Sequence, residues 1–208
     1  MIQSLRRSPL AHRAADLAAQ TGGVAMIEQP FLSMVSLRVD PASEIAARVE
    51  RVLGLTLPSA GAVASVVDGE GKRVVAGEER SVLWLGPDEW LVVGPVGDPA
   101  DLVALLSDAV GEGPGSVVDV SANRDTLVLS GPNARDLLEK GCTLDLHPRS
   151  FTAGRCAQTT FARGHVLLWQ TGAEDSASGP VYRLLFRGSF ADYFADWLTD
   201  AAAEYGAG

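Results

Sequence analysis

Residues 31–54, FLSMVSLRVDPASEIAARVERVLG, carry the pattern that decides the fold. The apolar residues of Phe31–Val39 indicate a strand. Asp40 and Pro41 then start a helix, because aspartate caps free backbone amides and proline suits the first helical position. Gly54 ends this helix, since glycine adopts the left-handed conformation readily. The segment therefore predicts a strand followed directly by a helix.

The rest of the first half continues this alternation. Short strands are expected at Val63–Val67, Arg73–Ala76, Val82–Leu85 and Trp90–Val93. Asp98 and Pro99 start a second helix in the same way as the first, and Gly111 ends it. The Gly-rich segment 111–116 then joins this half to the next one.

The second half has the same order of elements. Its strands are expected at Asp125–Leu129, Arg155–Phe161, His165–Gln170 and Val181–Phe186. One helix opens at Gly131-Pro132 and ends at Gly141, and Ser189 caps the last helix. The order strand, helix, strands, helix therefore occurs twice, as a weak internal repeat of roughly 90 residues.

These patterns predict an α+β fold made of two similar halves, each a mostly antiparallel sheet covered by helices. The first half spans residues 31–110 and the second spans residues 117–205, and we expect them to form one compact unit. Residues 1–30 form an arm with one short amphipathic helix. The arm has too few large apolar residues to fold alone, so it lies either on this domain or on a partner.

The composition excludes several classes of function. The chain has 208 residues, with 17 lysines and arginines against 26 aspartates and glutamates, which gives a formal charge of −9. This balance argues against nucleic acid and against an anionic membrane as partners, because both require clustered cations. No apolar run reaches the ~18 residues needed to span a bilayer. With no secretion signal, Cys142 and Cys156 are expected to be reduced, buried thiols in a cytoplasmic protein.

The usual signatures of an active site or cofactor site are missing from the sequence. Segment 111–116 is rich in glycine, but it follows a helix, whereas a dinucleotide loop follows a strand. No nucleophile elbow is present. The histidines His12, His147 and His165 are scattered, at no metal-ligand spacing. We therefore expect no catalytic residue, no cofactor and no metal in this chain.

Two polar stretches each allow two interpretations. Asp88 and Glu89 lie in a turn between Trp84 and Trp90, where they are solvated or, in an apolar pocket, act as acid and base. The two tryptophans are core residues or interface anchors.

The second stretch contains Asp119, Ser121, Asn123, Arg124 and Asp125. Its side chains bond the backbone of a turn, or they form a contact patch whose arginine binds a carboxylate.

Residues 119–148, DVSANRDTLVLSGPNARDLLEKGCTLDLHP, resemble the gamma subunit of heterotetrameric sarcosine oxidase. Residues 84–92, WLGPDEWLV, and 8–11, SPLA, are similar to the same family, and the resemblance spans most of residues 5–205. It implies membership of a complex that oxidises sarcosine to glycine, with formation of hydrogen peroxide and 5,10-methylenetetrahydrofolate. It also implies a fold similar to the folate-binding domain of the glycine-cleavage T-protein.

The same resemblance implies that other subunits hold the chemistry of the complex. FAD, covalently attached FMN, NAD, tetrahydrofolate and zinc belong to those subunits, and the expected partners are the alpha, beta and delta chains. Lys140-Gly141-Cys142 is similar to the start of a signature in a related folate-dependent iron–sulfur accessory protein. The tyrosine and the Gly-Gln-Glu that complete that signature are missing, which argues against redox or folate activity at Cys142.

Three functions remain open at this point. The first is a non-catalytic subunit that stabilises a flavoenzyme complex. Its candidate partner contacts are Leu5, Pro9, Leu10, Trp84, Trp90 and Arg124. The second is a stand-alone tetrahydrofolate-binding module, with Asp119, Asp125 and Trp169 as candidates by residue type. The third is a scaffold subunit of another flavin oxidoreductase. For the first function, loss of residues 1–20 is expected to weaken assembly and leave the fold intact.

Overall fold

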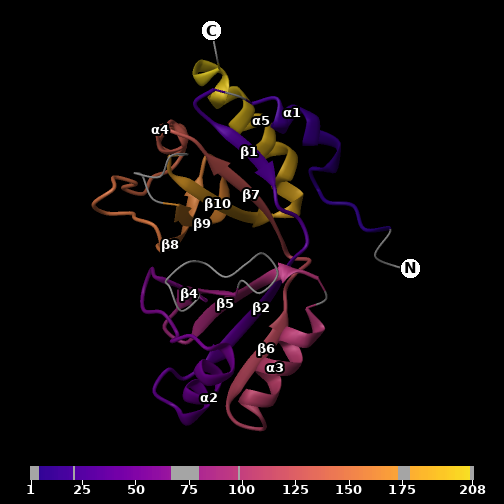
Figure 1. The fold of residues 1–208 in the computed structure, drawn as a ribbon, viewed down its shortest axis with the longest axis vertical. Coiled ribbons are helices and arrows are strands. Elements are labelled where there is room, and N and C mark those ends of the chain that lie inside the picture. The colour runs from indigo at the N-terminus through magenta and orange to yellow at the C-terminus, as the bar shows by residue number, and fades with distance from the viewer. Residues whose placement is uncertain (1–4, 21, 67–79, 98, 173–178, 207–208) are drawn as a thin grey trace. The chain divides into compact units, whose positions relative to one another are not determined.

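The computed structural model describes residues 5–20, 22–66, 80–97, 99–172 and 179–206. The chain divides into two compact units. The terminal unit contains residues 1–30 and 123–208, and the central unit contains residues 31–122. Figure 1 shows that each unit consists of helices beside a sheet, and each sheet has five strands. The predicted α+β class is confirmed.

The sheet of the central unit has the strand order β3-β4-β5-β2-β6, and every neighbouring pair is antiparallel. Its strands are β2 (Leu32–Val39), β3 (Val63–Ser65), β4 (Ser81–Gly86), β5 (Glu89–Val96) and β6 (Gly115–Asp119). Helices α2 (Glu44–Leu53) and α3 (Ala100–Val110) pack on the sheet face that carries Val35, Leu37 and Val92. The expected strand at Arg73–Ala76, and Asp98 at the expected helix start, lie outside the described residues.

The sheet of the terminal unit has the order β1-β7-β10-β9-β8, again antiparallel throughout. Its strands are β1 (Ala25–Glu28), β7 (Arg124–Ser130), β8 (Cys156–Phe161), β9 (Gly164–Gly172) and β10 (Val181–Arg187). Its helices are α1 (Ala14–Ala18), α4 (Ala134–Glu139) and α5 (Ala191–Ala202). The core between helices and sheet includes Phe161, Phe186 and Phe194.

Two helix starts differ from those that the sequence predicts. Helix α2 begins after Ser43, whose hydroxyl oxygen accepts a hydrogen bond from the backbone N–H of Ala46 at 3.2 Å. Asp40 instead accepts from Ala42 and so stabilises the turn before the helix. The predicted cap at Ser189 is wrong, because this residue lies in a 3-10 turn and no side chain caps the start of α5. Local turns thus displace both starts along the chain.

The N-terminal arm is part of the terminal unit. Leu10 and Leu17 are fully buried in the core of that unit. The Ser8 hydroxyl and the Leu10 amide both donate to the carboxylate of Glu28, at 2.7 and 3.0 Å. Glu28 ends strand β1, which pairs with β7. The sequence left open whether the arm lies on this domain or on a partner. In the structure it packs on this chain's own terminal unit.

The two units share one topology. In chain order the central unit is β2-α2-β3-β4-β5-α3 and the terminal unit is β7-α4-β8-β9-β10-α5. The starts of β2 and β7 differ by 124 − 32 = 92 residues, and the starts of α3 and α5 by 191 − 100 = 91. This spacing agrees with the repeat of roughly 90 residues that the order of elements predicts.

Each unit has a fifth strand that precedes the other unit's repeated elements in the chain. Strand β1 precedes β2 in the chain yet pairs with β7, and β6 precedes β7 yet pairs with β2. Both donated strands lie at a sheet edge (Figure 1), so the order β1-β7-β10-β9-β8 matches β6-β2-β5-β4-β3. The sequence places residue 117 onward in the second half. Backbone pairing places β6 in the central unit instead, because its residues pair with Val35–Val39 of β2.

Candidate functional site

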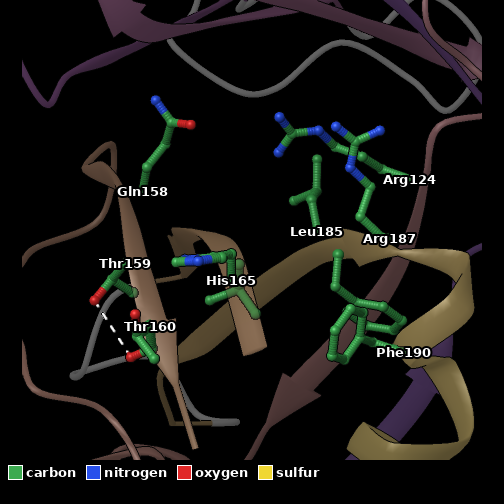
Figure 2. Close-up of a pocket in the computed structure, with 10 residues that line it drawn as sticks. Arg124, Gln158, Thr159, Thr160, His165, Leu185, Arg187 and Phe190 are labelled. Atoms are coloured by element: carbon green, nitrogen blue, oxygen red, sulfur yellow. Dashed lines mark hydrogen bonds between the residues drawn. The ribbon is translucent and has the colours of Figure 1, made fainter. Parts of the chain in front are cut away.

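A cavity of about 520 Å³ lies in the terminal unit, where β7 begins and β10 ends. All four strands β7 to β10 contribute to it, together with the 3-10 turn before α5. Its polar lining consists of Arg124, Gln158, Thr159, Thr160, His165 and Arg187. Figure 2 shows the Arg124 and Arg187 side chains beside one another, with the ring of Phe190 on another wall of the cavity.

The strand register explains why these side chains meet. Arg124 and Arg187 are direct partners across β7 and β10, and His165 is the direct partner of Thr160 across β9 and β8. The pairing of Phe186 with Val166 brings His165 beside Arg187 on the neighbouring strand. Facing residues of a sheet point to the same side. We call Arg124, Arg187 and His165 the cationic row.

Asp125, which is buried, and Glu28, which is half-buried and ends the arm's strand β1, form a pair of carboxyl groups. Asp125 is 4% exposed, and its environment raises the pKa to about 7. The largest cause is burial, followed by the hydrogen bond and the repulsion with Glu28. A protonated Asp125 donates to the Glu28 carboxylate, which already accepts from Ser8 and Leu10. The pair therefore fastens the arm to β7, and sequence reasoning identified Asp125 only by residue type.

Neither cysteine has the surroundings of a reactive thiol. Cys142 lies at a second cavity, of about 430 Å³, which Trp197 also lines. Burial raises the pKa of the Cys142 thiol, so this side chain remains protonated and is a weak nucleophile. Cys156 is buried in β8, and neither cysteine forms a disulfide. These positions agree with their interpretation as small apolar residues.

The predicted partner contacts differ widely in exposure. Leu5 is 82% exposed, Pro9 is also exposed, and Trp84 and Arg124 are half-buried. Leu10 has no exposed surface, so its side chain is a core residue of this chain and not a free contact. Trp90 is likewise buried, at 2% exposed, and its indole N–H donates to the carbonyl of Pro58. Leu10 looked unsupported in the sequence because its core partners lie far along the chain, whereas Trp90 takes the core position that the sequence had left open beside the interface.

The polar turns have structural roles. Arg38 donates two hydrogen bonds to Asp88, at 2.9 and 3.0 Å, so this carboxylate is paired and half-exposed. Asp119 accepts from both the amide and the hydroxyl of Ser121. The Ser121 hydroxyl in turn accepts from the amide of Met34. The interpretation of residues 119–121 as a turn in which side chains bond the backbone is confirmed.

The remaining candidates for folate binding are distributed over both units. Trp169 is 2% exposed, with the Arg183 guanidinium 4.8 Å from the centre of its ring. It lies in the terminal unit with Asp125, whereas Asp119 lies in the central unit. Asp125 is occupied by its pairing with Glu28.

The histidines have separate environments. His12 contacts Asp192 at 2.8 Å, the ring of His147 accepts from the amide of Arg149, and His165 belongs to the cationic row. Within the described ranges, no group of three or more metal-ligating side chains comes together. In the same part of the chain, no helix has the length and apolar character needed to cross a bilayer.

The paired α+β units form a fold that a solved glycine cleavage T-protein shares. A solved aminomethyltransferase T of the glycine cleavage system, from Bartonella henselae, superimposes with a TM-score of 0.66 at 13% identity. The match covers 93% of this chain and 57% of that one, and at this identity it shows the fold alone. The likeness to the T-protein that the sequence implied is therefore confirmed at the level of the fold.

The family follows from closer matches. The model of the sarcosine oxidase, gamma subunit family matches residues 38–204, and the chain belongs to this family. It is 41% identical to sarcosine oxidase subunit gamma of Corynebacterium sp. (strain U-96) over 208 residues, which covers 98% of this chain and 93% of the relative. The subunit from Corynebacterium sp. (strain P-1) is 40% identical over 205 residues, 97% of this chain and 92% of the relative.

A solved structure supports the same conclusion. A chain of the heterotetrameric sarcosine oxidase from Corynebacterium sp. U-96, in complex with pyrrole 2-carboxylate, superimposes with a TM-score of 0.84. The two chains are 40% identical, and the match covers 98% of each. The resemblance found in residues 119–148 is thus confirmed along nearly the whole length of the chain.

Proposed function

We propose that this chain is the gamma subunit of a heterotetrameric sarcosine oxidase and that it contributes structure, not chemistry, to the complex. The observation that carries the proposal is the match to a chain of such a heterotetramer, with 98% of both chains covered at a TM-score of 0.84. The partners are the alpha, beta and delta subunits. FAD, FMN, NAD, tetrahydrofolate and zinc are assigned to those subunits, and the complex oxidises sarcosine to glycine in the cytoplasm.

The surface of the arm supports an assembly role. Leu5 is 82% exposed, and Ile27 on the edge strand β1 is 64% exposed. Large apolar side chains on an edge strand are sites for contact with another chain. We therefore place the partner contact on Leu5, Pro9 and Ile27, with the half-buried Trp84 as a further contact on the central unit.

Co-purification from the native host tests the assignment. A tagged chain is expected to recover three further subunits in equal amounts, with the absorbance of a flavin and with sarcosine oxidase activity. The chain purified alone is expected to be colourless, to be inactive and not to bind tetrahydrofolate at micromolar concentration. Recovery of the chain without any flavoprotein, or a flavin bound to the chain alone, would overturn the proposal.

Paired variants test the contact surface. Leu5→Ser combined with Ile27→Ser is expected to lower the yield of the complex at least tenfold, because these changes remove exposed apolar area without touching the core. Val52→Ser on α2 is the matched control, since Val52 is also apolar and is 36% exposed. Equal yields from both variants would show that the contact lies elsewhere.

A further inference from the structure

We propose that residues 8–20 of the arm, which we call the strap, open and close in response to pH. Asp125 and Glu28 hold the strap closed while they share a proton, and the strap leaves the terminal unit when that proton is lost. The opening is local to the terminal unit. It therefore does not depend on the assignment of the chain to an oxidase complex.

Glu28 is the point at which the strap is attached to the sheet. Its Oε2 atom accepts a hydrogen bond from the Ser8 hydroxyl at 2.7 Å, and its Oε1 atom accepts from the Leu10 amide at 3.0 Å. Both donors belong to the strap, whereas Glu28 ends β1 and is paired with Leu127 of β7. The attachment thus uses both oxygens of one carboxylate, and that carboxylate is held by the sheet.

Asp125 lies between the two places at which the strap contacts the sheet. One place is Glu28, to which the Asp125 side chain is hydrogen-bonded. The other is Gly188, directly after β10, the strand that pairs with β7 on the side away from β1. The Pro9 ring comes within 3.3 Å of the point where a side-chain carbon on Gly188 would lie. Residues 8–10 therefore cover Asp125, which agrees with its exposure of only 4%.

The surroundings of Asp125 favour its neutral form. Its Oδ2 atom is buried and has no hydrogen-bond partner within the described part of the chain. Successive residues of a strand point to opposite faces, so Arg124 and its partner Arg187 lie on the other side of the sheet. A buried carboxyl group without a cation stays protonated, because burial of an unpaired charge is costly. Burial accordingly raises the pKa of Asp125 to about 7, and the neighbouring Glu28 raises it further.

The strap also has contacts with α5 that involve charge. His12 lies 2.8 Å from Asp192 and is charged only when it is protonated, so this contact is a competing source of pH dependence. Arg13 joins Asp196 at 2.7 Å, a pair of which neither member titrates near neutral pH. The other charged side chains on the strap or directly before it are exposed, namely Arg6, Arg7 and Asp16.

Loss of the shared proton favours the open strap. In the closed state Asp125 keeps its proton up to about pH 7, whereas an exposed aspartate releases it near pH 3.9. The open state therefore binds fewer protons between these values, and a rise in pH shifts the equilibrium toward it. A fully exposed Asp125 would raise the open population up to about 30-fold between pH 5.5 and pH 8. Leu10 and Leu17, which are buried, oppose the opening at every pH.

Amide hydrogen exchange of the free, full-length chain at pH 5.5 and pH 8 tests the strap. Each rate is divided by the rate of an unstructured peptide at the same pH, because the chemical step itself becomes faster as the pH rises. The protection of residues 10–19 is expected to fall by about 5- to 30-fold at the higher pH. At pH 8 it should be at least about tenfold lower than the protection of α5.

Two outcomes of this experiment would overturn the proposal. Equal protection of residues 10–19 at both pH values would show that the strap does not respond to pH. Protection of residues 10–19 equal to that of α5 would show that the strap opens only when the whole unit unfolds.

Variants assign the pH dependence to the shared proton. Asp125→Asn still donates to Glu28 but cannot ionise, so the protection of its strap should change less than about twofold between pH 5.5 and pH 8. His12→Asn is the matched control, because it removes the other contact that depends on protonation and should keep the wild-type fall. A wild-type fall in Asp125→Asn, or no fall in His12→Asn, would contradict the proposal.

Glu28→Gln tests the attachment point. The amide nitrogen of glutamine cannot accept a hydrogen bond, so this variant loses one of the two acceptors that Ser8 and Leu10 use. Its strap should be less protected than that of the wild type already at pH 5.5, while the protection of α5 shows that the variant is folded. Wild-type protection of the strap in Glu28→Gln would reject Glu28 as the attachment point.

An effect on assembly rests on the proposed function, because Leu5 precedes the strap and Ile27 is next to Glu28 in the proposed contact surface. Recovery of the complex is then expected to be lower at pH 8 than at pH 6 for the wild type and equal for Asp125→Asn. A strap that opens in the free chain, with equal recovery at both pH values, supports the strap and rejects that contact surface. A chain that recovers no flavoprotein at either pH rejects the proposed function, whereas hydrogen exchange still decides the strap.

Discussion

The central and terminal units use the same topology but hold their donated strands differently. In the terminal unit, β1 is fastened by an arm with two fully buried leucines, Leu10 and Leu17, and by the pairing of Glu28 with Asp125. In the central unit, β6 is mostly exposed, with Val118 at 50%, and it is held by backbone pairing with β2 and by the partly buried Val117. Topology therefore decides which strands pair, whereas side chains decide how firmly an added strand is held.

Removal of the arm is expected to give the largest loss of stability in the terminal unit. Deletion of residues 1–20 removes Leu10 and Leu17 and both hydrogen-bond donors to Glu28. Truncation of one buried leucine costs about 2–5 kcal/mol, so the deletion should lower the free energy of unfolding by more than about 4 kcal/mol. Urea unfolding of the full and shortened chains measures this loss.

This result would replace the expectation from sequence that such a truncation leaves the fold intact. Leu5→Ala is the control, because a side chain that is 82% exposed should change stability by less than about 0.5 kcal/mol. A shortened chain as stable as the full one would show that the arm contributes nothing to the core.

The carboxyl pair of Asp125 and Glu28 should make the stability of the terminal unit depend on pH. The folded pKa of Asp125, about 7, lies above the value of ~3.9 in an unfolded chain. Between these values the folded state retains a proton that the unfolded state releases. The contribution of Asp125 to the free energy of unfolding is therefore fully present below about pH 4 and is lost as the pH rises through 7. The expected slope is up to about 1.4 kcal/mol per pH unit.

Asp125→Asn keeps a hydrogen-bond donor for Glu28 but cannot ionise, so its stability should vary less with pH over this window. The free energy of unfolding in urea at pH 5 and pH 8 gives the comparison. Asp119→Asn in the central unit is the matched control, since Asp119 is exposed at the end of β6. Parallel pH profiles for the wild type and Asp125→Asn would contradict the shared proton.

Removal of the serine hydroxyls at the helix starts is expected to give the smallest difference in stability between the units. Ser43→Ala removes the side-chain acceptor at the start of α2 and should cost about 1 kcal/mol. Ser189→Ala in the terminal unit should change stability by less than about 0.5 kcal/mol, because Ser189 caps no helix. Thermal unfolding of the two variants measures both effects. An equal loss at Ser189 would show that the 3-10 turn before α5 depends on this hydroxyl.

Sequence patterns predicted the features that depend on neighbouring residues. The alternation of strands and helices, the stop of α2 at Gly54 and the spacing of the repeat are all local signals. The exchange of β1 and β6 was not predicted, because Ala25 pairs with Ser130, more than 100 residues further along the chain. Pro41 also gave a misleading signal, since Asp-Pro can open a turn as well as a helix.

The cationic row was missed for a related reason. Arg124 attracted attention as a possible carboxylate contact, but nothing in the sequence joins it to residues 165 and 187. Only the register of β7, β10 and β9 brings these three positions to one cavity. A search for opposed like charges on expected neighbouring strands would have identified the pair Arg124 and Arg187 once the strand order was known.

The exchange of edge strands has a consequence for how such a chain can be divided. A fragment that ended after α3 would contain β1 but lack β6, and the complementary fragment would contain β6 but lack β1. Each piece would then have four strands of one sheet and an orphan that fits the other. Two copies of one repeat could complete both sheets by exchanging their leading strands, which would give an intertwined homodimer.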